Sequence, residues 1–259
     1  MYTRIIKDKI RKFSLEDKIL RLKKRNYKNA EKYLKKSKQE IKYLGNDFLM
    51  DKKIILSIKC NEIVAALETD PEKRAAEMYA VGFSYSLLDK SKTAKRYYMS
   101  AAKNGNPRAI NALGVLYIRE KKYTAALKFL EQALNSGYNM ALHSLGFLYF
   151  KMKKYDLSEE YYKKSIDSEP KDFGEKFYKS EAMCNLGILY EKLNKEELAV
   201  EYYKMGVDYN NHPRSMFYLG KFYQSKNRFD LAEEYYKMAA EEDYSPAKYY
   251  LKELAKKDH

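Results

Sequence analysis

The chain has 259 residues and a formal net charge of +15, with 27 Tyr, 10 Gly, 5 Pro and no Trp. Few Gly and Pro residues, together with abundant Lys, Glu, Leu and Ala, favour long helices and argue against an all-β fold. Charged residues occur throughout Met1 to Phe13, and no apolar stretch approaches the roughly 18 residues that a membrane span requires. We therefore expect neither a cleaved signal nor a transmembrane segment.

The first quarter of the chain carries most of the positive charge, because Met1 to Cys60 holds 19 Lys plus Arg against 7 Asp plus Glu. Apolar residues recur at helical spacing over residues 14–69, so we expect two or three helices there. Opposite this apolar seam lies a basic run that includes Arg21, Lys24, Arg25, Lys28, Lys32, Lys35 and Lys36. The run is either a surface for nucleic acid or acidic membrane, or the solvated outer face of capping helices.

From about Asp70 onward one short motif recurs five times. It reads Val-Gly-x-x-Tyr and then four times Leu-Gly-x-x-Tyr, with glycines at Gly82, Gly114, Gly146, Gly187 and Gly220 and spacings of 32, 32, 41 and 33. A second block follows each motif at constant distance, for example Ala94 with Tyr97-Tyr98. Both blocks have helical periodicity, which predicts a helix, a short turn and a second helix in every repeat. Glycine inside a helix costs about 1 kcal/mol relative to alanine, so we expect a neighbouring helix against each bare backbone.

Prolines mark the repeat boundaries, since Asp70-Pro71, Asn106-Pro107, His212-Pro213 and Ser245-Pro246 are typical of helix starts. The predicted repeats lie near 71–105, 106–138, 139–170, 180–211 and 212–244, with a capping helix at 245–257. The 41-residue step inserts about nine residues, Lys171 to Lys179, which either lengthen a helix or bulge as a loop. We expect a basic helical segment at 1–69 packed on a repeat solenoid at 70–259.

The run Ala101 to Ala109 (Ala-Ala-Lys-Asn-Gly-Asn-Pro-Arg-Ala), followed by Leu113-Gly114 and Tyr117, resembles the Sel-one-like variety of the tetratricopeptide repeat. The likeness covers roughly Asp70 to Lys257, and the third and fourth repeats are nearer to the plain tetratricopeptide form. It implies an all-α superhelix of about five helix pairs with extra N-terminal helices and a C-terminal cap. It also implies a scaffold or adaptor that binds a peptide or protein partner.

In this family the first helix of each repeat lines the concave surface, so the resemblance implies contact positions counted from each Leu-Gly pair. They are Tyr79, Phe83, Asn111, Val115, Ile118, Arg119, His143, Phe147, Phe150, Lys151, Cys184, Ile188, Glu191, Phe217, Lys221 and Gln224. Their apolar centre and basic flanks suit an extended peptide or amphipathic helix with hydrophobic anchors and an acidic residue. The alternative is that Val115, Phe147 and Ile188 simply pack between repeats.

No motif indicates catalysis. His143, His212 and His259 lie outside metal or triad spacing, and HExxH, GxSxG, Walker and GxGxxG motifs are absent. Cys60 and Cys184 form no CxxC pair, which indicates neither a zinc site nor a disulfide framework. We expect a cytoplasmic, non-enzymatic protein without cofactor or metal. The alternative is a nucleic-acid-associated or regulatory protein that uses the basic N-terminal helices while the repeats sense a peptide or recruit a partner.

Overall fold

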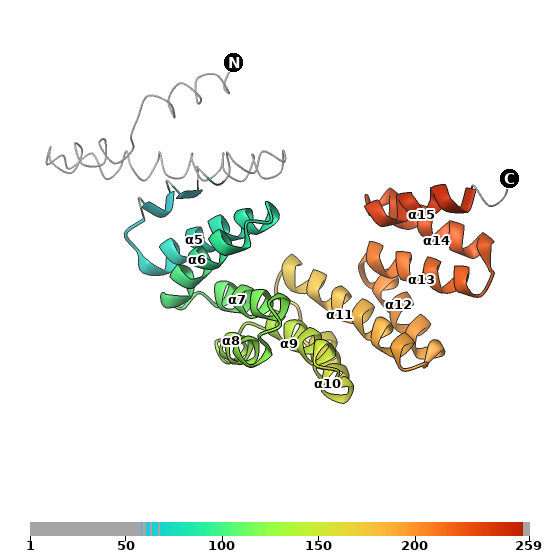
Figure 1. Ribbon diagram of the computed structural model, residues 1–259, viewed down its shortest axis with the longest axis horizontal. Coiled ribbons are helices and arrows are strands. Elements are labelled where there is room, and N and C mark those ends of the chain that lie inside the picture. Colours follow the sequence, from blue (N-terminus) through green and yellow to red (C-terminus); the bar gives the residue numbers. More distant parts are fainter. Residues whose placement is uncertain (1–57, 59–60, 63, 67, 256–259) are drawn as a thin grey trace, which may run out of the picture. The chain divides into compact units, whose positions relative to one another are not determined.

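The computed structural model describes residues 58, 61–62, 64–66 and 68–255. This part is helical without strands, which confirms the all-α prediction (Figure 1). Its helices are α5 (Pro71–Leu87), α6 (Ser91–Lys103), α7 (Pro107–Arg119), α8 (Tyr123–Asn135), α9 (Met140–Lys151), α10 (Tyr155–Asp167), α11 (Phe173–Lys192), α12 (Glu196–Asn210), α13 (Pro213–Ser225), α14 (Phe229–Glu241) and α15 (Ser245–Ala255). The helices predicted for residues 14–57, with the basic run that includes Arg21 and Lys36, lie outside the described residues.

The chain divides into two compact units, Met1–Ala109 and Ile110–His259, and each is described by itself. In the first unit α5 packs on α6; in the second, α9 packs on α10, α11 on α12 and α13 on α14. Contacts of α10 with α11 and of α12 with α13 join successive pairs. The predicted helix pairs are thus confirmed.

One turn geometry joins the two helices of every repeat. A residue with left-handed φ ends the first helix: Asp89 (55°), Lys121 (58°), Lys153 (60°), Asn194 (56°) and Asn227 (58°). The backbone N–H of the next residue then donates to the carbonyl of the motif tyrosine, as from Lys122 to Tyr117 at 2.9 Å. This bond satisfies a carbonyl at the helix end. The same next residue is the N-cap of the second helix.

The motif glycines lie against the second helix of their own repeat. A Cβ added to Gly82 would lie 2.7 Å from the ring of Tyr98, and one added to Gly146 would lie 2.6 Å from the ring of Tyr162. The glycines of the fourth and fifth repeats meet Tyr203 and Tyr236 in the same way, and Gly114 meets Leu130. The close approach expected from the motif is therefore present in each pair.

Each motif tyrosine packs its ring against the first aromatic residue of the block that follows; four of these pairs are stacked, and the Tyr190 ring is tilted against Tyr202. The ring centroids are 5.5 Å apart for Tyr85 and Tyr97, 5.3 Å for Tyr117 and Phe129, 5.3 Å for Tyr149 and Tyr161, 5.4 Å for Tyr190 and Tyr202, and 5.6 Å for Tyr223 and Tyr235. Such offset contacts stabilise a helix pair beyond the area they bury. These tyrosines are packing residues of the helix pair.

The insertion after the third repeat lengthens a helix. α11 has 20 residues, whereas α9 has 12 and α13 has 13. Asp172 Oδ1 accepts from the backbone N–H of Glu175 at 2.8 Å, and Glu175 Oε2 accepts from the N–H of Lys171 at 2.7 Å. These two bonds cap the helix start in a variant of the capping box, with Glu175 reaching the residue before the N-cap. Of the two predicted alternatives, the longer helix is the one adopted.

The C-terminal helix α15 covers the last repeat. Ala247 and Leu254 are buried. The ring of Tyr250 lies 5.2 Å from that of Phe217 and 5.4 Å from that of Tyr236. The predicted capping helix is confirmed, and it shields apolar surface that the fifth repeat would otherwise expose.

Candidate functional site

The structure places the predicted contact residues at different depths. In the first unit Tyr79 is half-buried and Phe83 is exposed. In the second unit the exposed or half-buried positions are Val115, Arg119, His143, Phe147, Phe150, Lys151, Ile188, Glu191, Lys221 and Gln224. Asn111, Ile118, Cys184 and Phe217 are buried. These four side chains offer little surface to a partner.

Packing explains three of the buried positions. Ile118 belongs to a core cluster with Leu145 and Leu148. Cys184 lies in the larger cluster, and burial raises the pKa of its thiol to about 12. Phe217 is enclosed by aromatic rings, including that of Tyr250 on the capping helix. Each of these positions has a less buried equivalent in another repeat, since His143 corresponds to Cys184 and Phe217, and Phe150 to Ile118. The neighbours that cover the position therefore differ between repeats.

Phe147 and Ile188 have features of both roles considered from the sequence, packing between repeats and contact with a partner. Both pack against the larger core cluster while part of each side chain remains accessible. Gln224 is half-buried, and its Oε1 accepts from the Tyr236 hydroxyl at 2.7 Å. These side chains support the helix packing as well as contributing to a surface.

In the second unit the first helices of successive repeats are in contact, α9 with α11 and α11 with α13. Together they form what we call the first-helix face: His143, Phe147, Lys151, Phe177, Tyr178, Asn185, Ile188, Arg214, Tyr218 and Lys221. The His143 ring lies edge-on to Tyr178 at 5.3 Å, and its Nε2 lies 2.8 Å from Asn185 Nδ2. Residues of two consecutive repeats therefore meet on this face.

His143 is a neutral member of the face. Burial lowers the pKa of its imidazole to about 4, so the ring carries no charge near neutral pH. With the Asn185 amide donating to Nε2, the remaining proton is on Nδ1. Among the described residues His143 Nδ1 and Asn111 Oδ1 are buried without a hydrogen-bond partner.

An ion-pair cluster ties α11 to the start of α13. Glu181 Oε2 lies 2.5 Å from an Arg214 guanidinium nitrogen, and Oε1 lies 3.2 Å from His212 Nε2. Burial would raise the pKa of Glu181, but the hydrogen bond with His212 and the charge of Arg214 lower it to about 2. Sequence reasoning missed this cluster. Its only signal is spacing, since Glu181 lies 31 and 33 residues before its partners, about one repeat.

Cations and aromatic rings alternate on the rest of the face. Arg214 lies 5.6 Å and Lys221 5.7 Å from the ring centroid of Tyr218, and Lys151 Nζ lies 5.0 Å from that of Phe147. Phe177, on the inserted turns of α11, is 42% exposed, with its ring 6.0 Å from that of His212. Sequence reasoning did not include Phe177, Tyr178, Arg214 or Tyr218. Such cation–π pairs hold both partners in place.

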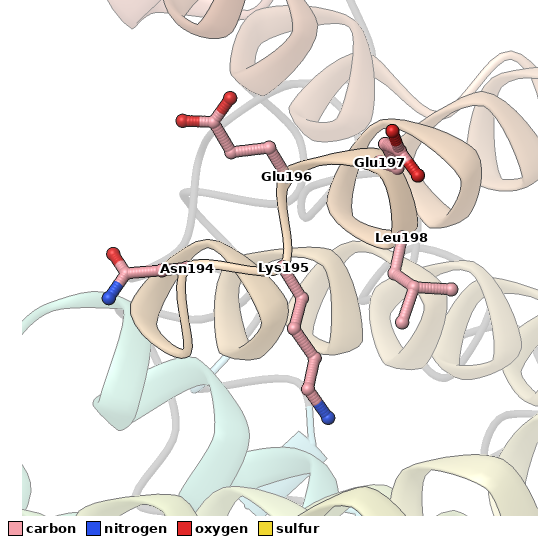
Figure 2. A pocket seen from close by; sticks show the side chains of 5 residues that line it. All are labelled: Asn194, Lys195, Glu196, Glu197 and Leu198. Carbon is pink, nitrogen blue, oxygen red and sulfur yellow. The ribbon is translucent and has the colours of Figure 1, made fainter.

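Ser215 Oγ lies 3.0 Å from His212 Nδ1, so Ser215, His212 and Glu181 form a hydrogen-bonded row, but the Ser215 and His212 side chains are fully buried and the hydroxyl is not accessible to a substrate. The described residues include no cluster of three or more His, Cys, Asp or Glu side chains able to hold a metal ion. Figure 2 shows the shallow depression at the turn between α11 and α12, where Asn194, Lys195 and Glu196 point in different directions. Among the described helices, none has both the length and the apolar character that a membrane span requires.

Comparison with family models identifies the repeat. Residues 138–211 match one tetratricopeptide repeat model, and residues 107–136 and 213–246 match another. The matched segments together cover α7 to α14, so they include every helix of the first-helix face. No curated protein sequence matches the chain.

Solved structures share the fold at low sequence identity. The Cut9–Hcn1 hetero-tetramer of APC/C aligns with a TM-score of 0.62 and 18% identity, over 82% of this chain and 41% of that one. This chain therefore spans about two fifths of that neighbour. Pseudomonas aeruginosa pilF aligns with a TM-score of 0.58 and 18% identity over 86% and 99% of the two chains. BtubC from P. vanneervenii has a TM-score of 0.58 and 13% identity over 76% and 91%. At these identities the likeness establishes the fold alone.

Proposed function

Because the chain belongs to the tetratricopeptide repeat superfamily, we propose that it is a non-enzymatic scaffold or adaptor that binds a peptide or protein segment on the first-helix face. Repeats of this kind usually act as protein-interaction modules. The protein acts without a catalytic step and is located in the cytoplasm. It also includes the Sel-one-like variety of repeat, which the Asn-Gly-Asn-Pro turn at residues 104–107 favours.

The observation that carries the proposal is the chemistry of this face. Phe147, Ile188 and Tyr218 keep accessible apolar surface. The ammonium group of Lys151 lies beside the Phe147 ring, and that of Lys221 lies beside the Tyr218 ring. Tyr and Arg are enriched among the residues that dominate binding energy at protein interfaces. An apolar centre with cations beside it suits a partner that supplies apolar anchors and negative charge.

Preorganisation strengthens the case. The Arg214 side chain is held by Glu181 and by Tyr218, and His143 is held by Asn185 and Tyr178. Side chains that are already ordered lose less conformational entropy when a partner binds. The face therefore suits binding of a flexible segment, which must itself lose entropy on association.

A random 12-residue peptide library displayed on phage and selected on the full chain tests the proposal. We expect enriched peptides with two or more large apolar residues. Their affinity, measured by fluorescence anisotropy, should fall at least tenfold in the variant Phe147→Ala/Phe177→Ala, because apolar anchors dominate such interfaces.

The matched control is Phe229→Ala, since Phe229 is 44% exposed but stands at the start of a second helix. This control should bind the peptides as the wild type does. Circular dichroism confirms that each variant is folded. Equal binding by the wild type and by the folded Phe147→Ala/Phe177→Ala variant would refute the assignment to the first-helix face.

A further inference from the structure

The turns inside the second and third repeats are rich in exposed cations. We call them the lysine turns. Their residues are Arg119 at the end of α7 with Lys121 and Lys122 after it, and Lys151 at the end of α9 with Lys153 and Lys154 after it. All six side chains are exposed, and all belong to the unit Ile110–His259. The two turns occupy equivalent positions in consecutive repeats.

Two of these lysines occupy a backbone conformation that disfavours them. Lys121 and Lys153 have φ of 58° and 60°, in the left-handed region that is strained for residues with a Cβ. Gly and Asn are the usual residues at this helix-ending position, and Asn194 and Asn227 occupy it in the fourth and fifth repeats. The second and third repeats therefore place a lysine where another residue would be more stable.

The next residue in each turn also opposes helix stability. Lys122 and Lys154 are the N-caps of α8 and α10, and neither makes a side-chain capping bond. Ser, Thr, Asp or Asn would accept a hydrogen bond there, and a cation near a helix N-terminus is disfavoured by the helix dipole. The dipole accounts for Arg119 and Lys151, which lie in the last turns of α7 and α9, but not for these caps. All five second helices begin at an uncapped Lys or Arg, so the feature particular to the second and third repeats is the lysine at the left-handed position. A residue that breaks a local rule in this way is expected at a functional surface.

The positive charge of the lysine turns is largely uncompensated. Within the described residues Lys121, Lys153 and Lys154 take part in none of the ion pairs, and only Lys122 is paired, with Glu120 at 2.8 Å. The following turn, between α11 and α12, differs because Glu196 and Glu197 directly follow Lys195 (Figure 2). Glu196 also pairs with Lys226 at 2.6 Å. The lysine turns therefore differ from the turn of the fourth repeat in carrying several exposed cations outside ion pairs.

Lys151 joins these turns to the first-helix face, because its Nζ lies 5.0 Å from the ring centroid of Phe147 and 6.0 Å from that of Phe150. We propose that the lysine turns bind an acidic segment of a partner protein whose neighbouring apolar residues dock on the first-helix face. The inference rests on the proposed function and specifies the chemistry of the partner.

The extent of the patch favours a short acidic segment over a nucleic acid. Binding of a nucleic-acid strand uses a basic groove that follows the phosphate backbone over several nucleotides. Here the acidic pair Glu196 and Glu197 interrupts the basic surface at the next repeat. Two or three carboxylates beside an apolar anchor match a patch of this size.

The test uses the same peptide library on the full chain and on the variant Lys121→Asn/Lys122→Ser/Lys153→Asn/Lys154→Ser. On the wild type we expect enriched peptides with two or more Asp or Glu next to apolar residues. On the variant the acidic preference should disappear, and the affinity for the wild-type peptides should fall about tenfold through loss of partly screened charge interactions. The variant should also melt about 5 °C higher, because each substitution relieves a local conflict.

Lys195→Ser/Arg228→Ser is the matched control, since it replaces the equivalent uncapped N-caps of α12 and α14 and should leave peptide affinity unchanged. Apolar peptides without acidic residues, or an acidic preference that survives in the variant, would overturn the inference while leaving the proposed function standing. No enriched peptide on either protein would overturn both. A 20-nucleotide RNA or duplex DNA that binds the wild type more tightly than any peptide and is released by the variant would assign the turns to nucleic acid instead.

Discussion

Substitution of Gly146 by alanine tests the packing principle of the repeat. In an exposed helix Gly→Ala stabilises by about 1 kcal/mol, because alanine has the higher helix propensity. At Gly146 the new Cβ would lie 2.6 Å and 2.7 Å from two ring carbons of Tyr162 and 3.0 Å from its Cγ. The Tyr162 ring is fully buried, so it cannot rotate away.

The two effects oppose each other, and the structure indicates which is larger. Ordinary contact requires the ring to retreat by roughly 1 Å, and overpacking of this kind costs about 1–3 kcal/mol. Because the contacts involve ring atoms near Cγ, the movement involves the backbone of α10. We expect Gly146→Ala to lower the free energy of unfolding by about 2 kcal/mol, against the helix propensity.

Urea unfolding followed by circular dichroism measures this change. Gly174→Ala is the matched control, because its Cβ would approach no atom more closely than Asp172 Oδ1 at 3.2 Å and Met140 Cε at 3.4 Å. This control should be neutral or slightly stabilising. In a double-mutant cycle Tyr162→Ala should remove at least about 1 kcal/mol of the cost of Gly146→Ala. A stabilising Gly146→Ala, or purely additive effects, would refute the packing argument.

Two further predictions concern buried groups of the second unit. Glu181→Gln should cost about 3 kcal/mol at pH 7, since the pKa of Glu181 is about 2 in the fold against an ordinary 4.5. A lowered pKa stabilises the fold above pH 4.5, and this contribution is lost as pH falls toward 2. The difference in free energy of unfolding between wild type and variant, measured in urea, should therefore become smaller in acid. A difference that does not change with pH would contradict the prediction. In a Cys60→Ser background Cys184 should resist a thiol reagent such as dithionitrobenzoate until urea unfolds the chain, because the thiol is fully buried and burial raises its pKa to about 12. Rapid labelling of the native protein would disprove this.

Much of the fold follows from local sequence because each repeat solves the same packing problem. The glycine of Leu-Gly-x-x-Tyr predicts a close helix neighbour, and Tyr162 and Tyr203 occupy that space in two of the repeats. The insertion at Lys171 was harder to assign, since its length is compatible with a loop or a helix. The decisive signal is Asp172-x-x-Glu175, a capping pair visible in the sequence.

The candidate site was only partly predictable because burial depends on neighbouring repeats. Ile118, Cys184 and Phe217 share a first-helix register with accessible residues, yet the surrounding helices cover them. Arg214 was missed because its role arises from Glu181, which lies one repeat earlier. Counting from each motif finds the right helices, whereas contacts between repeats decide which side chains are accessible.

The stacked aromatic pairs make the protein suitable for optical measurement of its unravelling. The chain contains no Trp, so a single Trp at Phe129, which stacks on Tyr117 at 5.3 Å, would be its only indole. Equivalent replacements at Tyr97, Tyr161, Tyr202 and Tyr235 would bring the set to five proteins, each with a single Trp in a different repeat. Because each repeat of a solenoid depends mainly on its immediate neighbours, the order in which these signals change would show from which end the stack opens.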